Sequence, residues 1–350
     1  MIKSNEISVV IQGPITACTS LCIESVKNIL PDAELILSTW KNSDLSNIDL
    51  SNIILVENDD PNPSGVTYYN EVDKKHPFNL NRQIVSSKNG IDKATNKYVL
   101  RMRGDIKIES SDFLKYWEQF DKRNEDFSFF KHRILVPSLV SICPKNNSEY
   151  FQVQISDWLQ FGLKEDLVEL YNLDLMSEED MDFYVNNDFE IPKGFIDLDI
   201  NSKWRWGSEQ YLFVANFKKK LVDINYPHRK AITSDILAFE KQFFINNFIV
   251  LDSIDFKFDN FKHPVENLFL IWCKHFEYWN ALYRYNIFQM NYKQNCDQKY
   301  KIKFNDLSLI LIKHLRQGKQ AGEHGLERIP RPERIKKIFK VILEMIKIKG

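Results

Sequence analysis

The segment Tyr98-Val-Leu-Arg-Met-Arg-Gly-Asp105-Ile-Lys-Ile108 sets the interpretation of this sequence. Residues two apart on a strand share a face, so Arg101, Arg103 and Asp105 line one side of the expected strand and apolar residues line the other. Ligands bind at the carboxyl ends of strands in open α/β sheets. A carboxylate there can hold a divalent metal against a pyrophosphate, because hard cations prefer oxygen ligands. The alternative is a structural ion pair between Arg103 and Asp105.

The residues before this segment alternate between strand and helix patterns. Apolar runs predict strands at residues 7–12, 34–40 and 52–57, and apolar spacing predicts helices at residues 21–30 and from residue 79. Continuous apolar strands separated by helices are typical of a parallel sheet covered by helices. The sequence therefore predicts an α/β fold with a single Rossmann-like, mostly parallel sheet.

The second half of the chain carries further patterns of the same kinds. Residues 151–157 alternate as a strand does and end in Asp157, and residues 163–170 are expected to be helical. Ser208 is a candidate N-cap for a helix that carries Glu209. Helical patterns, such as the one at 307–315, then predominate. The expected parts are a catalytic domain over residues 1–215, a mainly helical region over 216–325 and a basic amphipathic tail over 326–350.

The composition limits the class of protein. Of the 350 residues, 43% are hydrophobic and 13% aromatic, which is enough for a substantial core. The formal net charge of -1 does not indicate a nucleic-acid partner. Five scattered cysteines without a CxxC pair indicate reduced thiols. With no signal-peptide pattern and no apolar run of about 18 residues, we expect a cytoplasmic protein.

Several common catalytic motifs are absent from the sequence. It has no GxGxxG fingerprint and no GxxxxGK[ST] phosphate loop, which argues against a nicotinamide dehydrogenase and a P-loop kinase. It has no GxSxG elbow, so an α/β-hydrolase is unsupported. The histidines show no metal-ligand spacing such as HExxH.

Polar residues follow the expected strands and open the helix that starts near residue 79. Free backbone N–H groups at a helix start bind anions, and an arginine there adds a bidentate donor. This organisation is typical of nucleotide-sugar transferases, with the base and ribose over the first strands and the diphosphate near Arg82 and Asp105. The candidate donor contacts are Gln12, Gly13, Thr39, Asn58, Asn81, Arg82, Arg103 and Asp105.

Six short motifs occur in a fixed order along the chain. They are Val9-Val-Ile-Gln-Gly-Pro14, Ile36-Leu-Ser-Thr-Trp40, Asn81-Arg-Gln-Ile-Val85, Leu100-Arg-Met-Arg-Gly-Asp-Ile106, Ser156-Asp-Trp158 with Phe161-Gly162, and Glu209-Gln-Tyr211. Together they resemble the WavE family of lipopolysaccharide-synthesis proteins, bacterial glycosyltransferases with a GT-A-like fold. The resemblance implies transfer of a sugar from a nucleotide-sugar to a lipid-linked or oligosaccharide acceptor of a surface glycan, such as lipopolysaccharide core, O-antigen or capsule.

Roles for the candidate residues follow from this resemblance and from their positions. Asp105 is expected to bind metal or the donor, while Arg82 and Arg103 neutralise the leaving diphosphate. Asp157 or Glu209 acts on the acceptor hydroxyl as general base, with Asp157 preferred. The alternatives are that Asp157 caps a following helix and that Glu209 only complements a helix dipole.

Two tryptophans are candidate acceptor platforms, and the metal is an open expectation. Trp158 and Trp206 have faces on which a sugar can stack, although tryptophans more often pack in a core. Gly104 stands where the resemblance leads us to expect serine, and the second carboxylate of a DxD-type pair is missing. Mn²⁺ or Mg²⁺ at Asp105 is the expected metal site, and the missing carboxylate leaves the metal dependence of the reaction open.

Two rival functions stay open at this point. The same diphosphate site suits a transferase of another nucleotide-activated group, such as a polyol phosphate. A non-catalytic module that binds a nucleotide-sugar or a glycan is the other rival, and the missing second carboxylate supports it. Turnover rather than binding separates this module from an enzyme.

The last residues of the chain predict contact with a membrane surface. Within residues 331–350, apolar residues recur on one helical stripe and seven Lys or Arg residues oppose two Glu residues. A basic amphipathic helix of this kind lies at the surface of an anionic membrane, here the inner membrane. The alternative is an ordinary terminal helix that packs on the domain or on a second copy.

Deletion of residues 331–350 is expected to abolish salt-sensitive co-sedimentation with anionic liposomes. Each cation near an anionic leaflet contributes about 1 kcal/mol, so the loss is large. Neutral liposomes serve as the control, since they offer no charge to the lysines. Co-sedimentation that is unchanged by the deletion would reject membrane recruitment by this segment.

Overall fold

A computed structural model gives the fold. It describes residues 2–61, 67–69, 75–142, 152–188, 203–220, 222–231, 233–262, 265 and 284–302. The predicted helix at 307–315 and the predicted tail at 326–350 lie outside these residues.

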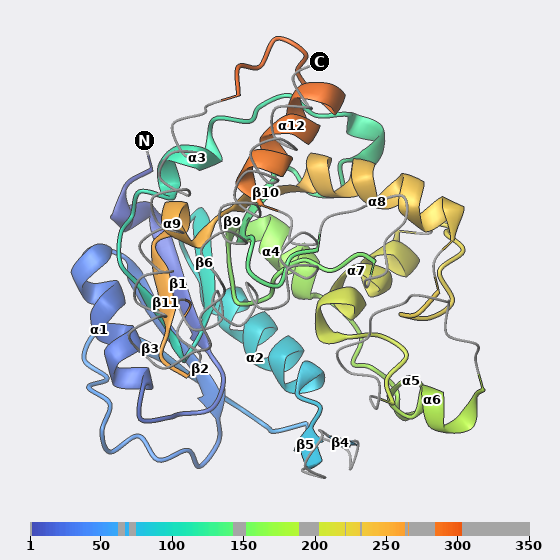
Figure 1. Cartoon of the computed structure of the whole chain (residues 1–350). Coiled ribbons are helices and arrows are strands. Elements are labelled where there is room, and N and C mark those ends of the chain that lie inside the picture. Colours follow the sequence, from blue (N-terminus) through green and yellow to red (C-terminus); the bar gives the residue numbers. More distant parts are fainter. Residues whose placement is uncertain are drawn as a thin grey trace, which may run out of the picture.

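Among the described residues, seven strands form one central sheet (Figure 1). In chain order they are β1 (Ile7–Gln12), β2 (Glu34–Trp40), β3 (Ile53–Asn58), β6 (Tyr98–Arg103), β8 (Ile134–Pro137), β9 (Leu159–Leu163) and β10 (Phe248–Leu251). Their spatial order is β10-β8-β9-β6-β1-β2-β3. All neighbours pair in parallel except β9, which runs antiparallel to both β6 and β8. The predicted α/β fold with a mostly parallel sheet is confirmed.

Helices and two short strand pairs surround this sheet. The α-helices of the described residues are α1 (Thr19–Ile29), α2 (Leu80–Lys93), α3 (Leu114–Trp117), α4 (Lys164–Tyr171), α5 (Glu178–Met181), α6 (Phe183–Asn186), α7 (Ser208–Lys219), α8 (Ser234–Asn247), α9 (Ser253–Phe256) and α12 (Tyr285–Asn295), with 3-10 turns η1 (Ser4–Glu6) and η2 (Glu125–Phe127). The strand pairs are β7 (Ile106–Ile108) with β11 (Phe258–Asn260), and β4 (Thr67–Tyr69) with β5 (Lys75–Pro77). None of these helices is long and apolar enough to span a membrane.

Helix α2 packs directly on the sheet because a glycine faces it. A Cβ added to Gly90 would lie 2.5 Å from Val10 Cγ1 and 3.0 Å from Ser38 Cβ. The helix therefore approaches β1 and β2 closely, with α1 on the other side of this part of the sheet (Figure 1). This close contact fixes where the first turn of α2 stands beside the carboxyl ends of the strands.

The sheet extends into the region that the sequence predicted as mainly helical. Strand β10 pairs with β8 in the central sheet, and β11 pairs with β7. Both strands come from beyond residue 215, and α7 crosses that position. The aromatic side chains of α8 pack on this edge of the sheet, where Phe243 and Phe244 both contact Phe248. Residues 248–260 are thus part of the sheet structure that holds the first 215 residues.

One predicted strand is misplaced and another is shorter than expected. The strand predicted at residues 151–157 is wrong, because the strand is β9, which begins at Leu159. Val153 has a positive φ of 55°, which an extended strand cannot contain. The strand predicted to run to Asp105 ends at Arg103, and Gly104 and Asp105 form a turn before β7.

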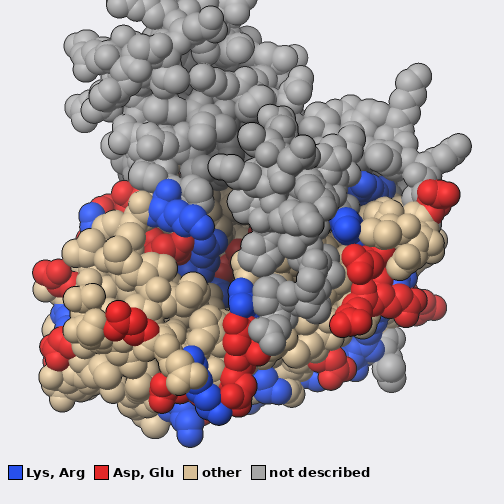
Figure 2. Space-filling view, turned by 90° about the horizontal axis from the view of Figure 1, so that it is seen from below, with Lys and Arg blue, Asp and Glu red and all other residues tan. Residues whose placement is uncertain are grey.

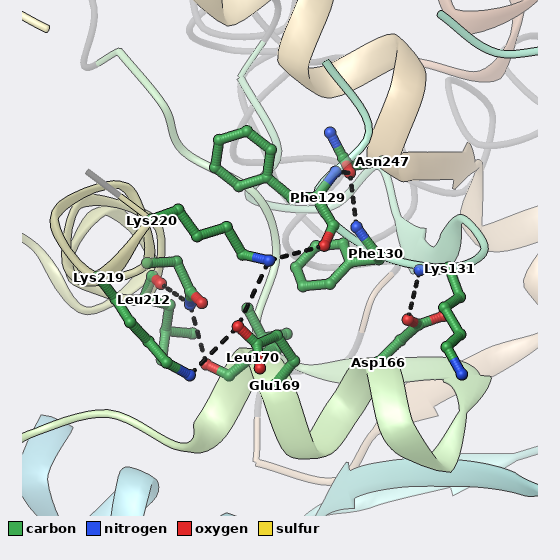
Figure 3. A network of polar contacts seen from close by, with 11 residues as sticks. Phe129, Phe130, Lys131, Asp166, Glu169, Leu170, Leu212, Lys219, Lys220 and Asn247 are labelled. Carbon is green, nitrogen blue, oxygen red and sulfur yellow. Dashed lines mark hydrogen bonds and ion pairs between the residues drawn. The ribbon is translucent and has the colours of Figure 1, made fainter. Parts of the chain in front are cut away.

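Polar contacts join α4 and α7 to the segment at residues 129–131 (Figure 3). Glu169 on α4 pairs with Lys219 at 3.2 Å and with Lys220 at 3.4 Å. The Asp166 carboxylate accepts hydrogen bonds from the backbone N–H groups of Lys131 and His132. Burial raises the pKa of Asp166 to about 6, in spite of these bonds. The helix that follows β9 is thereby tied to the segment that leads into β8.

Replacing Gly90 by alanine is expected to destabilise the protein by about 1–3 kcal/mol, because the added methyl group overpacks α2 against β1 and β2. Helix propensity alone predicts the opposite sign, by about 1 kcal/mol. Urea unfolding measures the difference.

Gly104→Ala is the matched control. A Cβ at Gly104 lies 3.6 Å from its nearest neighbour, Thr19 Oγ1, an ordinary contact. Its free energy of unfolding should stay within about 0.5 kcal/mol of the parent. If Gly90→Ala is as stable as this control, α2 does not need the glycine to pack.

Candidate functional site

The candidate residues meet at the edge of the sheet where β1, β2 and β6 end. The N–H of Gly104 donates to the carbonyl of Gln12 at 3.0 Å, and the N–H of Arg103 donates to the carbonyl of Trp158 at 3.2 Å. Strand β9 starts at this edge because it runs antiparallel to β6. Asp157, which precedes β9, therefore lies beside Arg103 and not at the far end of the sheet.

Arg103 and Asp105 form a bidentate ion pair. Arg103 Nη2 lies 2.7 Å from Asp105 Oδ2, and Arg103 Nε lies 3.1 Å from Asp105 Oδ1. The two side chains are 30% and 12% exposed, so a ligand can reach the guanidinium. The guanidinium also lies 5.4 Å from the centre of the Trp158 ring. The ion pair that the sequence left as an alternative is present, and it lies within the candidate site.

Three carboxylates share the charge of Arg103. Burial lowers the pKa of Arg103, but Asp105, Asp157 and Glu209 outweigh it and raise that pKa above its ordinary value. These are the three residues that the sequence predicted as catalytic. They come from a turn after β6, a segment before β9 and the first turn of α7. The fold thus brings together residues that lie more than one hundred positions apart.

Asp157 is a buried carboxylate that caps no helix among the described residues. It is 7% exposed, and its carboxylate makes no hydrogen bond to any described residue. A strand follows it, so the alternative that it caps a helix is wrong. Its own carbonyl accepts a hydrogen bond from Nη1 of Arg101. Its electrostatic neighbours include Arg103 and Tyr171.

Arg101 is a buried arginine that holds the segment of Asp157 in place, a role that the sequence did not predict. It is fully buried, and its Nε donates to Ser87 Oγ on α2 at 3.0 Å. Its guanidinium lies 5.2 Å from the ring centre of Tyr171 on α4. With the bond to the Asp157 carbonyl, one side chain links α2, α4 and the segment that carries Asp157. Its alternation with Arg103 along the strand was the only signal for this role.

Glu209 lies in the first turn of α7 as predicted. The N-cap is Gly207 and not Ser208, because the Gly207 N–H donates to Gln210 Oε1 at 3.0 Å. A carboxylate in a first turn complements the helix dipole, so Glu209 has the position that this alternative requires. Glu209 also lies close enough to Arg103 to act on its charge. A general-base role for Glu209 stays a prediction.

Gln12, Gly13 and Thr39 lie at the ends of β1 and β2. Gln12 Oε1 accepts from Ser86 Oγ on α2 at 2.6 Å. Gly13 has a φ of 118°, which L side chains rarely adopt, and a Cβ there would meet nothing within 4 Å. A ligand can therefore approach the Gly13 backbone. Thr39 is fully buried, with its hydroxyl 3.3 Å from Ser43 Oγ.

Two of the predicted donor contacts hold the fold together in this structure. The amide of Asn58 donates to the Thr39 carbonyl at 2.7 Å, which joins β3 to β2. The amide of Asn81 forms two hydrogen bonds with the Met176 backbone, at 3.1 and 2.8 Å. A donor-binding role for either amide stays a prediction, and it requires these bonds to be shared or replaced.

Arg82 is also paired with a carboxylate. Its Nε lies 2.8 Å from Asp60 Oδ1, and its Nη2 lies 2.5 Å from Asp60 Oδ2. The side chains are 27% and 32% exposed. Asp60, which follows β3, was not among the predicted residues, although its acidic run after a strand was a visible signal. Both predicted phosphate-binding arginines therefore have an aspartate partner.

The two predicted acceptor platforms have different surroundings. Trp158 is 8% exposed and lies next to the Arg103 guanidinium. Trp206 is 1% exposed and packs against Tyr226, with ring centres 4.9 Å apart. Trp206 thus has the core environment that the sequence left open as the alternative. Its acceptor-binding role is untested and stays a prediction.

The donor set around Asp105 does not fit a divalent cation in this arrangement. Both oxygens of Asp105 accept from Arg103. In the described part of the chain, no group of three or more His, Cys, Asp or Glu side chains is arranged to hold a metal ion. Below the turn, the Cys22 thiol donates to the Gly104 carbonyl, and burial together with Asp105 raises its pKa to about 12. Metal binding by Asp105 stays a prediction.

Charges of both signs are interspersed on the face of the molecule shown in Figure 2. Acidic side chains gather on the right of this view, where Figure 1 places α5. The first turn of α5 carries Glu178, Glu179 and Asp180. Arg205 pairs with Asp180 at 3.1 Å, so this acidic group has a cation of its own.

A family model described as WavE lipopolysaccharide synthesis matches residues 7–316 of the chain. No curated protein matches the sequence. Similar solved structures include a 4-diphosphocytidyl-2C-methyl-D-erythritol synthase from Anaerococcus prevotii, at 13% identity and a TM-score of 0.29, over 67% of this chain and 95% of that one. Galactosyltransferase LgtC with donor and acceptor sugar analogues is similar at 13% identity and a TM-score of 0.29, over 48% and 60%. A Drosophila galactosyltransferase with manganese, UDP-Gal and xylobiose is similar at 10% identity and a TM-score of 0.27, over 66% and 68%.

Replacing Arg103 by leucine is expected to destabilise the protein by about 1–2 kcal/mol near neutral pH, because ionised carboxylates lose their shared cation. The loss should shrink toward about pH 4, where carboxylates begin to bind protons. Without the cation, the ionised carboxylates are less favourable in the folded state of the variant. The free energy of unfolding of Arg103→Leu, relative to the parent, therefore falls as pH rises through this range. Urea unfolding at the two pH values measures the effect.

Arg205→Leu is the matched control for this variant. The Arg205 side chain is 29% exposed, against 30% for Arg103, and among the described residues its ion-pair partner is Asp180. Its loss of stability should therefore depend less on pH. An Arg103→Leu loss with no greater pH dependence than this control would mean that the carboxylates are not coupled to Arg103.

Proposed function

Because this chain belongs to the WavE family of lipopolysaccharide synthesis, we propose that it is a glycosyltransferase. It moves a sugar from a nucleotide-sugar donor to a lipid-linked or oligosaccharide acceptor of a bacterial surface glycan. The observation that carries this proposal is the cluster of Asp105, Asp157 and Glu209 around Arg103 at the carboxyl edge of the sheet. A transferase needs a cation for the leaving group and a carboxylate for the acceptor, and this cluster contains both.

The proposed reaction uses one carboxylate as a base. Asp157 takes the proton from an acceptor hydroxyl, whose oxygen attacks the anomeric carbon of the donor sugar. The bond between that carbon and the phosphate oxygen breaks, and the nucleotide leaves with the electron pair. Asp157 later releases its proton to water. Its carboxylate has no hydrogen-bond partner among the described residues, so both of its oxygens are available to an acceptor hydroxyl.

Arg103 has the second role, which is to neutralise the leaving phosphate. A guanidinium presents a planar fork of donors that matches phosphate oxygens as well as carboxylate oxygens. In this structure that fork is bound to Asp105, and the fork of Arg82 is bound to Asp60. We infer that the donor phosphate takes the place of one of these carboxylates. The positive φ of Gly13 and the open space above it supply the close backbone approach for the nucleotide.

The cell compartment follows from the chemistry of the donor. Nucleotide-sugars are used where they are made, so the proposal places the protein in the cytoplasm, at the inner membrane surface if residues 331–350 bind lipid. A lipid-linked acceptor then lies within reach. A bound divalent cation, where the reaction uses one, would add positive charge at the phosphates.

The test is a thermal-shift screen against UDP, CMP, CDP, GDP and TDP and their sugars, each with and without manganese. A ligand present at about 100 times its Kd stabilises the folded state by about 2.7 kcal/mol. We expect one nucleotide to raise the melting temperature selectively. The same screen includes a nucleotide-activated polyol: a shift by that compound alone would favour the rival transferase, and the absence of any shift would count against the donor site.

Variants then assign the roles within the site. With the donor from the screen, Asp157→Asn should lower kcat by about 10²–10⁴-fold, the range for loss of a general base. Its donor-induced thermal shift should be retained. Glu209→Gln is the matched carboxylate control and should have the smaller effect. Full turnover in Asp157→Asn would remove Asp157 from the mechanism, and full turnover in Asp105→Ala would remove Asp105 from the site.

A further inference from the structure

The two carboxylates proposed for the acceptor side lie on separate segments that must be held in register. Asp157 lies in an irregular segment that the structure describes from Gln152 to Trp158, and Glu209 lies in the first turn of α7. Neither segment belongs to the sheet. A displacement of about 1 Å between reacting groups can cost roughly 10²-fold in rate. The structure therefore needs a device that sets the position of one segment against the other.

Gln210, the residue after Glu209, makes that connection. It is 1% exposed and points away from solvent. Its Oε1 accepts from the Gly207 N–H at 3.0 Å, which fixes the first turn of α7. Its Nε2 donates to the Gln152 carbonyl at 2.8 Å and contacts the Tyr226 hydroxyl at 2.8 Å. One side-chain amide thus joins the helix that carries Glu209 to the segment that carries Asp157.

Other buried groups hold the same segment from the remaining sides. The Tyr226 hydroxyl donates to the Gln152 carbonyl at 3.3 Å, and the Val153 N–H donates to Glu240 Oε1 on α8. The Ser156 N–H donates to Ser141 Oγ at 3.0 Å. Burial raises the pKa of Glu240 to about 8, so its neutral acid is the form that accepts the Val153 bond near neutral pH. Every one of these contacts acts on residues 152–156 and none touches the substrate site.

The backbone of this segment is strained, which explains why it needs such support. Val153 has a φ of 55°, a left-handed conformation that is costly for a β-branched residue. Val140, in the segment that faces it, has a φ of 66°, and its carbonyl accepts from Gln154 Nε2 at 3.2 Å. Strained residues of this kind persist only where the surrounding structure holds them, and they cluster at functional sites.

We propose that Gln210 is a positioning residue that sets the place of Asp157 relative to Glu209. This inference rests on the proposed glycosyltransferase function, and it gives the motif Glu209-Gln-Tyr211 a second functional member. Gln210 acts through the two carboxylates and does not contact the substrates. Its loss frees the start of the Asp157 segment without touching the donor side at Gln12 and Gly13.

The test compares Gln210→Leu with Asn216→Ala. Asn216 is a second buried amide on α7, and it donates to the Leu170 carbonyl at 3.2 Å, on the side of α4. Amide hydrogen exchange by mass spectrometry needs no substrate. We expect faster exchange at residues 152–160 in Gln210→Leu and not in Asn216→Ala. Equal exchange in the two variants would show that Gln210 does not hold the segment.

Kinetics with the donor identified by the thermal-shift screen give the functional readout. Gln210→Leu should lower kcat by about 10²-fold with an unchanged donor-induced thermal shift, because only the acceptor side is disturbed. Asn216→Ala should keep its kcat within a few-fold of the parent. Equal turnover in both variants would overturn the positioning role. A parent protein that binds and turns over no nucleotide-sugar would instead overturn the proposed function, and the exchange result would still stand.

Gln210→Glu separates positioning from general loss of packing. Its Oε1 keeps the Gly207 bond, and its second oxygen can donate to the Gln152 carbonyl only when the acid is protonated. The titratable groups packed around this cluster include Tyr226, Tyr184, Glu240 and Arg229. We expect the kcat of Gln210→Glu, relative to the parent, to rise as pH falls. A constant ratio across pH would contradict the role assigned to the amide.

Discussion

The site depends on one guanidinium that serves three carboxylates. Arg103 is the last residue of β6, the strand at the middle of the sheet. Because β6 pairs with both β1 and β9, the segments that follow β1 and precede β9 lie beside Arg103. Placing Asp105, Asp157 and Glu209 near one another without a cation would cost folding free energy through like-charge repulsion. With Arg103 among them the cluster can form, and each carboxylate can come from a different part of the chain. The cation that permits the carboxylates to lie together is also the one that the proposed function assigns to the leaving phosphate.

This arrangement also explains the polar face of the sheet. Between β1, β2, β6 and α2 lie the buried polar side chains of Gln12, Ser38, Ser86 and Arg101. Buried polar groups cost free energy unless they are hydrogen-bonded, and here most of them bond across elements. Such bonds stabilise less than apolar packing does, but they fix α2 in one register on the sheet. The first turn of α2 and the segment of Asp157 are then set relative to the same strand, because Arg101 contacts both α2 and the Asp157 carbonyl.

The sequence predicted the parts of this structure that depend on local pattern. The apolar runs of β1 and β2, the helical spacing of α1 and α2 and the turn residues after Gln12 act over a few positions, and they agree with the fold. The start of β9 could not be found in this way, because the alternation that predicts a strand covers residues 151–157, and only the pairing with β6 shows that the strand begins at Leu159. Strand β10 follows α8 directly, and its partner β8 is more than one hundred positions away in the sequence, so local pattern does not show the pairing. Gln210 acts through a bond to a distant carbonyl, for which a sequence pattern carries no signal, and the alternation of Arg101 with Arg103 shows a shared face but not the carbonyl that Arg101 binds.

The paired state of both arginines has a consequence for donor recognition. A phosphate that binds Arg103 or Arg82 must compete with Asp105 or Asp60, each already held by two hydrogen bonds. The net gain is the difference between two charge-assisted pairs, and it is much smaller than either pair alone. Charge by itself therefore contributes little affinity, and an isolated phosphate has little advantage over the aspartates. Discrimination falls to the contacts that only a complete nucleotide-sugar makes, over Gly13 and the ends of β1 and β2. In the proposed reaction, the carboxylate released by this exchange would become available to a ribose or sugar hydroxyl of the donor.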